Sequence, residues 1–187
     1  GWYNSEASAS FSVTSPWPGT QEMQYVCTGY SGDASGSGTS GSTTMNAPKT
    51  IAFTWKTQYL VTFGQTGVET DFPSMIIVDN VGYGRSGWSF WWDQNSQHSF
   101  SFISPLDVSS EMNYVWDSTI GLSTLQSGSI TVSTSGSVIG SYRTRFLVTF
   151  GVNPTAGGKM SVNNGPPSTS PDPIWVYKGD TISILAS

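Results

Sequence analysis

YLVTFG at residues Tyr59–Gly64 returns as FLVTFG at Phe146–Gly151, an offset of 87 positions (146 − 59). EMQYV at Glu22–Val26 returns in the same order as EMNYV at Glu111–Val115, an offset of 89 (111 − 22). Collinear matches of this kind are the mark of an internal repeat, which decides the fold before any single element does. The sequence therefore predicts copies of one structural module of roughly 87 residues.

The repeat divides the chain into three expected parts. We call residues 58–144 the middle copy, which holds every element from the opening strand to the closing strand. Residues 1–57, the first copy, match only the later part of that module, and residues 145–187, the last copy, match only its earlier part. Because half a module cannot bury its apolar face alone, the two halves are expected to meet, within one molecule or between neighbours.

The residue pattern within each copy is that of strands. Apolar residues alternate with serine in Phe11–Val13, Phe100–Phe102 and Ile182–Ile184. Alternation with a period of two buries one face of a strand and exposes the other. We find no helical periodicity, so the predicted fold is all-β, built from tandem antiparallel β-sandwich-like repeats. Residues 31–44 are rich in Gly, Ser and Thr, and this composition predicts a flexible surface loop.

Composition excludes several classes of partner. Only 10% of the 187 residues are charged and the net charge is −5, whereas nucleic-acid binding needs a basic stripe. No apolar run reaches the roughly 20 residues that span a bilayer, so membrane insertion is not expected. The chain starts at Gly1, without a charged leader, and we interpret it as a mature or excised segment of a secreted protein.

Residues for catalysis or metal binding are scarce. Cys27 and His98 are the single cysteine and the single histidine, which is too few for a zinc site or an activated thiol. We expect Cys27 to act as a buried hydrophobe and His98 to occupy a surface strand. Glu69, Asp71 and Asp79 could supply oxygen ligands to Ca²⁺, but a solvated loop is the favoured interpretation. The sequence therefore predicts no enzyme activity and no cofactor.

Aromatic residues gather in Gly87–Asp93, which reads GWSFWWD. Trp91 and Trp92 match Trp2 and Tyr3 of the first copy, so part of this cluster is expected in the core of the repeat. A subunit interface and a glycan-binding platform are the alternatives, because exposed aromatic rings serve both.

A family resemblance supports the repeat. Gly1-Trp2-Tyr3, the stretch Met45–Trp55 (MNAPKTIAFTW) and the opening strand that starts at Tyr59 resemble the InlB-type B-repeats of bacterial and archaeal cell-surface proteins. The resemblance covers residues 1–64 well and later parts more faintly. It implies a secreted, modular, all-β surface protein without catalysis of its own, and it specifies no ligand.

These observations predict a structural subunit of an extracellular filament or pilus-like surface assembly, polymerising head to tail by β-strand complementation. Its partner is then another copy of itself. The alternatives are an excised segment of a large cell-surface adhesin and a carbohydrate-binding module. The candidate interface residues are Trp2, Tyr3, Phe11, Val13, Phe146, Val148, Trp175, Tyr177, Ile182 and Ile184.

Overall fold

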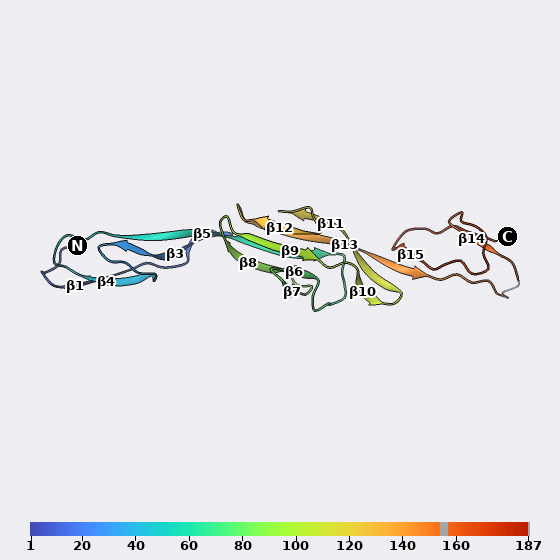
Figure 1. The fold of residues 1–187 in the computed structure, drawn as a ribbon, viewed down its shortest axis with the longest axis horizontal. Coiled ribbons are helices and arrows are strands. Elements are labelled where there is room, and N and C mark those ends of the chain that lie inside the picture. Colours follow the sequence, from blue (N-terminus) through green and yellow to red (C-terminus); the bar gives the residue numbers. More distant parts are fainter. Residues whose placement is uncertain (154–156, 187) are drawn as a thin grey trace. The chain divides into compact units, whose positions relative to one another are not determined.

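The structure, a computed structural model, describes residues 1–153 and 157–186, and the described residues form strands and no helix (Figure 1). The all-β fold class is thereby confirmed. Residues 154–156 and 187, which belong to the predicted last copy, lie outside the described part. The described chain divides into two compact units, and each is considered by itself.

Unit 1 comprises residues 1–62, 88–98 and 129–137. Its strands include β1 (Ser8–Ser12), β2 (Trp17–Thr20), β3 (Met23–Gly32), β4 (Ser40–Thr44), β8 (Trp88–Asp93) and the first part of β5 (Ile51–Thr66). Strand β3 is central here, because it pairs antiparallel with β2 on one edge and with β5 on the other. Strands β1 and β4 form a separate two-stranded ladder.

Unit 2 comprises residues 63–87, 99–128 and 138–187. Its strands include β6 (Ile76–Val78), β7 (Val81–Tyr83), β10 (Leu106–Ser109), β11 (Met112–Gly121), β14 (Met160–Val162), β15 (Ile174–Tyr177) and β16 (Ile184–Ala186). Strand β13 (Gly136–Val148) pairs with β11 and then, at its end, with β15. Strands β5, β9 (Gln97–Phe102), β12 (Ser127–Thr131) and β13 contribute residues to both units.

The core of unit 2 is aromatic and aliphatic. Phe63, Met75, Ile76, Phe102 and Val138 are fully buried. Along β6 and β9 the buried side chains alternate, as Ile76 with Val78 and Phe100 with Phe102, which is the period of two of a strand. The apolar alternation read from the sequence thus builds the buried face, and burial of each large side chain contributes about 1.5–3 kcal/mol.

Local geometry recurs at the offset of the sequence motifs. The Cys27 N–H donates to Ser15 Oγ at 2.9 Å, and 89 positions later the Trp116 N–H donates to Ser104 Oγ at 2.9 Å. The strand register shifts directly after Cys27 and directly after Trp116. Matching sequence stretches therefore adopt matching bulges and side-chain-to-backbone bonds.

The Gly/Ser/Thr stretch differs from its prediction. Residues 40–44 form β4, paired residue by residue with β1, although 31–44 was expected to be a flexible loop. Strand pairing uses the backbone, so small residues suffice where a larger neighbour covers them. At Gly41 an added Cβ would collide with the rings of Tyr30 and Phe11, which pack edge to face with centroids 4.8 Å apart. The glycine is needed there for close packing.

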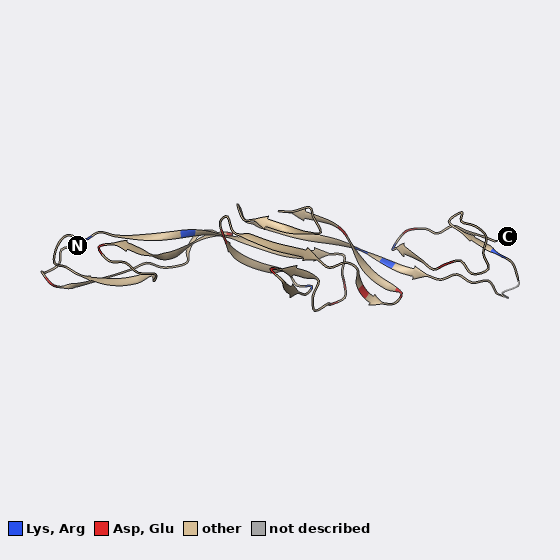
Figure 2. Ribbon diagram, viewed as in Figure 1, with Lys and Arg blue, Asp and Glu red and all other residues tan. Residues whose placement is uncertain are grey.

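Charged residues are few and scattered along both units (Figure 2). Among the described residues, no helix has the length and apolar character needed to cross a membrane.

Candidate assembly surfaces

Tyr114 on β11 marks the closed core of the middle copy. Its side chain is 2% exposed, and its hydroxyl lies 3.2 Å from Thr70 Oγ1. The ring of Phe72 meets the Tyr114 ring edge-on, with centroids 6.3 Å apart. Thr70 and Phe72 belong to the segment that connects β5 with β6. This connecting segment covers Tyr114.

Tyr142 and Leu106 complete this closed core. Tyr142 is 6% exposed, and its hydroxyl donates to the Ile103 carbonyl oxygen at 2.9 Å. Burial raises the pKa of the Tyr142 phenol well above its usual range, because the phenolate would have to form away from water. Leu106 is also buried. The side chains of Tyr114, Tyr142 and Leu106 are thus closed off from solvent.

The matching positions of the first copy are open. Trp17, Tyr25 and Trp55 match Leu106, Tyr114 and Tyr142 at the repeat offsets, yet all three are exposed. With Val13 and Thr14 they line an open apolar cavity of about 640 Å³. Val13 is one of the interface candidates predicted from the sequence, whereas the other four were missed. Their alignment with apolar positions of the middle copy was the signal that pointed to them.

The first copy also contains a closed part. Phe11 on β1 packs against Tyr30 and against Phe53, with ring centroids 4.8 and 5.9 Å apart. In the middle copy the residue matching Phe11 is Phe100, whose ring packs against Phe63 at 5.8 Å. Phe63 comes from the opening strand of the middle copy, and residues 1–57 contain no match to that strand. A local aromatic cluster takes the place of that contact.

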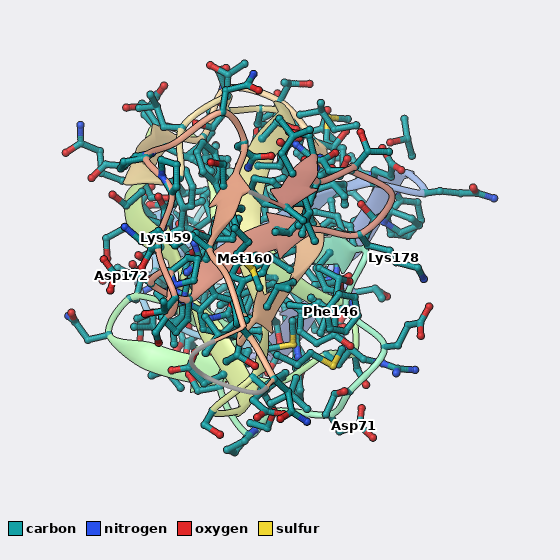
Figure 3. All side chains as sticks on the ribbon, turned by 90° about the vertical axis from the view of Figure 1, so that its right-hand side faces the viewer. Asp71, Phe146, Lys159, Met160, Asp172 and Lys178 are labelled. Carbon is teal, nitrogen blue, oxygen red and sulfur yellow. The ribbon has the colours of Figure 1, made fainter. Side chains whose placement is uncertain are left out.

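The sheet edges differ in the same way. In the middle copy, β9 lies inside a four-stranded sheet of order β12-β9-β6-β7. Among the described residues, the counterpart of this sheet in the first copy is the two-stranded ladder β1-β4. Its counterpart in the last copy is the ladder β14-β16, with a further bridge between Met160 and Ser168 (Met160 is labelled in Figure 3). Each of these small ladders therefore keeps an open edge within its own unit.

The ten interface candidates are largely accessible in the structure. Trp2 is fully exposed, and Tyr3, Phe146, Trp175 and Ile184 are also exposed. The remaining candidates are half-buried: Phe11, Val13, Val148, Tyr177 and Ile182. Residues 1–5 form no strand, whereas the matching stretches 88–93 and 174–177 do.

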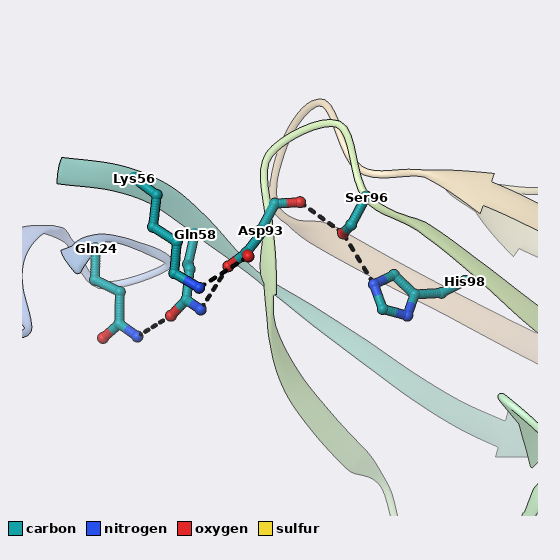
Figure 4. Close-up of polar contacts among 6 residues, drawn as sticks. All are labelled: Gln24, Lys56, Gln58, Asp93, Ser96 and His98. Carbon is teal, nitrogen blue, oxygen red and sulfur yellow. Dashed lines mark hydrogen bonds and ion pairs between the residues drawn. The ribbon is translucent and has the colours of Figure 1, made fainter. Parts of the chain in front are cut away.

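A polar network surrounds Asp93 at the end of β8 (Figure 4). The Lys56 ammonium and the Gln58 amide both donate to its carboxylate, each at 2.8 Å. These donors, Lys56 foremost, hold the pKa of the Asp93 carboxyl below its ordinary value. Gln24 extends the network from β3, because its side-chain amide donates to Gln58 Oε1 at 2.8 Å. The network joins β3, β5 and β8.

A cationic counterpart lies at the matching place one copy later. Arg143 lies over the Tyr177 ring, 4.0 Å from its centroid, and pairs with Asp180 at 3.6 Å. Arg145 lies over the Trp175 ring at 4.8 Å. These contacts place two interface candidates, Trp175 and Tyr177, against β13 by cation–π attraction as well as by strand pairing.

The Trp-rich stretch serves the core in part. Trp92 is buried and is stacked between Phe90, at 5.2 Å, and His98, at 3.6 Å and nearly parallel. His98 Nε2 lies 2.9 Å from the Ser96 hydroxyl, which in turn donates to the Asp93 carbonyl oxygen. Trp91, in contrast, is exposed. The glycan-platform hypothesis stays a prediction, tested by binding to a glycan array.

The acidic residues considered for Ca²⁺ are engaged in separate contacts. Asp71 pairs with Arg85 at 3.4 Å, and Arg85 also donates to the Glu69 carbonyl oxygen. The Asp79 carboxylate accepts from the Ser99 N–H at 2.9 Å. Within residues 1–153 and 157–186 no three His, Cys, Asp or Glu side chains gather as a metal site would require. Cys27 is half-buried rather than fully buried.

No family model, curated protein or solved structure matches this chain.

Proposed function

We propose that this chain is a structural subunit of an extracellular filament or surface assembly, which grows head to tail by β-strand complementation between copies. The observation that carries the proposal is the complementarity of the two small ladders. The pair β1-β4 reproduces the β9-β12 side of the middle sheet, and the pair β14-β16 reproduces its β6-β9 side. If one strand equivalent to β9 were shared by the two ladders, they would form a sheet with the strand order of the four-stranded sheet of the middle copy.

The open apolar cavity supports the same proposal. Trp17, Tyr25 and Trp55 are exposed although the matching positions of the middle copy are buried. Exposed apolar surface of this kind gains free energy when a partner covers it, at about 25 cal/mol per Å². Residues of the middle copy that cover Tyr114 lie between β5 and β6, so the expected cover is the early part of a module. The last copy of another molecule provides such a part.

Strand complementation between different surfaces leads to a polymer. An open strand edge presents unpaired N–H and C=O groups, which another chain satisfies by adding a strand. The first-copy surface and the last-copy surface are not identical, so their contact is heterologous. Such a contact propagates as a fibre unless the rotation between subunits closes a ring.

The test is the assembly state of the intact chain. We expect sedimentation velocity to show growth with concentration, and negative-stain electron microscopy to show filaments. Trp17→Asp should abolish them while leaving the far-ultraviolet circular dichroism unchanged, because Trp17 is already 57% exposed and a charge in the cavity resists burial. Ile120→Asp is the matched control, since Ile120 is 60% exposed on β11, outside the cavity. If the intact chain stayed a monodisperse monomer at every concentration, the proposal would be wrong.

A specific observation also favours a second candidate, a segment of a larger multi-repeat adhesin. Strands β5 and β13 each run without a break from the closing strand of one copy into the opening strand of the next. A covalently continuous array would complete every module in this way. In that case the isolated chain stays monomeric, and the same chain extended by one further 87-residue copy at each end gains thermal stability without forming filaments.

A further inference from the structure

The chain carries two versions of strand β9, and a single completed module has room for one. One version is β16, in the last copy, and the other is β1, in the first copy. Each repeats the contacts of β9 on a different edge. This redundancy bears on how a second copy is accepted, and any role for it rests on the proposed head-to-tail assembly.

Strand β16 reproduces the contacts of β9 with β6. The pairs Val78–Phe100 and Val162–Ile184 lie at the same place in their ladders, 84 positions apart (162 − 78). The turn residues agree as well. The Asn163 N–H donates to the Ser183 carbonyl at 2.9 Å, as the Asp79 N–H donates to the Ser99 carbonyl at 3.0 Å. Strand β14 is therefore a β6-type strand whose β9-type position is filled by β16.

Strand β1 reproduces the contacts of β9 on the opposite edge. The Val13 N–H donates to the Thr39 carbonyl at 2.9 Å, as the Phe102 N–H donates to the Gln126 carbonyl at 2.9 Å. Strand β1 is thus a β9-type strand that holds its β12-type partner, β4. What β1 lacks, within its own ladder, is the β6-type neighbour that β14 represents.

The two versions differ in how well they are packed. On β16, Ile184 and Leu185 are 57% and 60% exposed, and the ladder to β14 has three residue pairs. On β1, Ala9 is 8% exposed, Phe11 packs in the aromatic cluster, and the ladder to β4 has five pairs. Strand β16, which buries less apolar surface than β1, is therefore the strand that occupies the β9-type position beside β14.

We propose that β16 is a place-holder, which β1 of a second copy displaces from β14 during assembly. The resulting strand order, β4-β1-β14, repeats the order β12-β9-β6 of the middle copy. One ladder replaces another, so backbone hydrogen bonds are nearly conserved in number. Apolar burial then decides the direction of exchange, and it favours β1 because Phe11 and Val13 replace the exposed residues of β16.

The flanking segments follow the same pattern. Strand β15 pairs with β13 at Phe146 and Val148, whereas its counterpart in the first copy, residues 1–5, forms no strand and leaves Trp2 fully exposed. Displacement of β16 therefore brings an unpaired β8-type segment, with Trp2 and Tyr3, next to the strand edge that β15 now occupies. After β1 of the second copy has displaced β16, residues 1–5 of that copy are expected to displace β15 from β13.

A reversible disulfide between β14 and β16 tests whether β16 must leave β14 before filaments form. In a Cys27→Ser background, Ser161→Cys with Leu185→Cys places two thiols at directly paired positions of β14 and β16. Cα atoms of such pairs lie about 4.5–5.5 Å apart, within the range of a disulfide. The matched control is Ile77→Cys with Ser101→Cys, the equivalent pair of β6 and β9 in the middle copy. Disulfide formation is verified by thiol titration, and filament formation is followed by light scattering and electron microscopy.

We expect the oxidised β14–β16 variant to form no filaments and to regain them on reduction, while the oxidised control polymerises throughout. Ile184→Asp is the second arm. It weakens β16 at an exposed position, so it should shorten the lag before filaments form. Filaments from the oxidised β14–β16 variant, or their loss in Ile184→Asp, would overturn the exchange and leave the proposed function intact. Absence of filaments from the parent chain overturns the proposed function itself.

Discussion

Tyr25 and Tyr114 are the same residue at matching positions of two copies, and the structure treats them oppositely. Tyr114 is 2% exposed beneath Thr70 and Phe72, whereas Tyr25 is 37% exposed at an open cavity. The strands that carry them, β11 and β3, share a register and a bulge. The strand pattern therefore places an apolar side chain on one face of a strand, while a different segment determines whether that face is covered.

The first copy nevertheless keeps a core of its own. Phe53 on β5 occupies the position that Gly140 occupies on β13, and it fills space beside Phe11 and Tyr30. In the middle copy the corresponding space is filled by the Phe102 ring, which lies against Gly140. Equivalent spaces in the two copies are thus filled by different side chains. In the middle copy the packing also includes Phe63 of the opening strand.

The largest difference in stability is expected between Tyr114→Ala and Tyr25→Ala. Tyr114→Ala removes a buried ring and leaves a cavity, so we expect a loss of about 3–5 kcal/mol in the free energy of unfolding. Tyr25→Ala removes a ring that is already partly solvated, so we expect a loss below about 1 kcal/mol in the dilute chain. Urea unfolding at low protein concentration measures both. Equal losses would mean that the cavity at Tyr25 is closed in solution.

A medium effect is expected at Gly140. An added Cβ would lie 2.6 Å from Cε1 of Phe102, whose ring is fully buried. Gly140→Ala should therefore reduce the free energy of unfolding by about 1–3 kcal/mol, the usual range for overpacking.

The control is a double-mutant cycle with Phe102→Val, which introduces the residue found at the matching position 13. The alanine should be nearly neutral in that background, because the shorter side chain frees the space. Additive losses would show that Gly140 and Phe102 do not compete for the same space.

The smallest effect concerns Asp93, which belongs to a polar network rather than to either core. Its pKa is lowered from the ordinary 3.8 in the folded chain, chiefly by the hydrogen bond from Lys56, so the folded state binds fewer protons than the unfolded state as pH falls through that region. The stabilisation is complete above the unfolded pKa and is lost as pH falls through the folded pKa. Asp93→Asn should flatten the acid limb of a melting-temperature profile.

The matched control for this prediction is Asp33→Asn. The Asp33 carboxylate accepts from the Thr50 N–H, away from Lys56, so its replacement should leave the Lys56-dependent part of the profile in place. An unchanged acid limb in Asp93→Asn would show that Asp93 does not contribute to acid stability.

The sequence predicted the fold class because alternation is a local property. Phe100–Phe102 shows the period of a strand and lies in β9, and Phe11–Val13 begins in β1, which ends at Ser12. Of Ile182–Ile184, only Ile184 lies in a strand, β16. The sequence did not predict β4, because glycine and serine pair through their backbone and carry no apolar signal. Nor did it predict the open cavity, since Trp17, Tyr25 and Trp55 are as apolar as their buried counterparts. Their exposure depends on a covering segment distant in the sequence.

The long strands β5 and β13 have a mechanical consequence. Each continues from one copy into the next without a residue outside the strand, so neither junction holds spare length that a pull could draw out. Tension along the backbone would pass directly into the ladders with β3 and β11, where many hydrogen bonds must break together. Failure under load is then expected to begin at a shorter ladder, and β14–β16, with three pairs, is such a place.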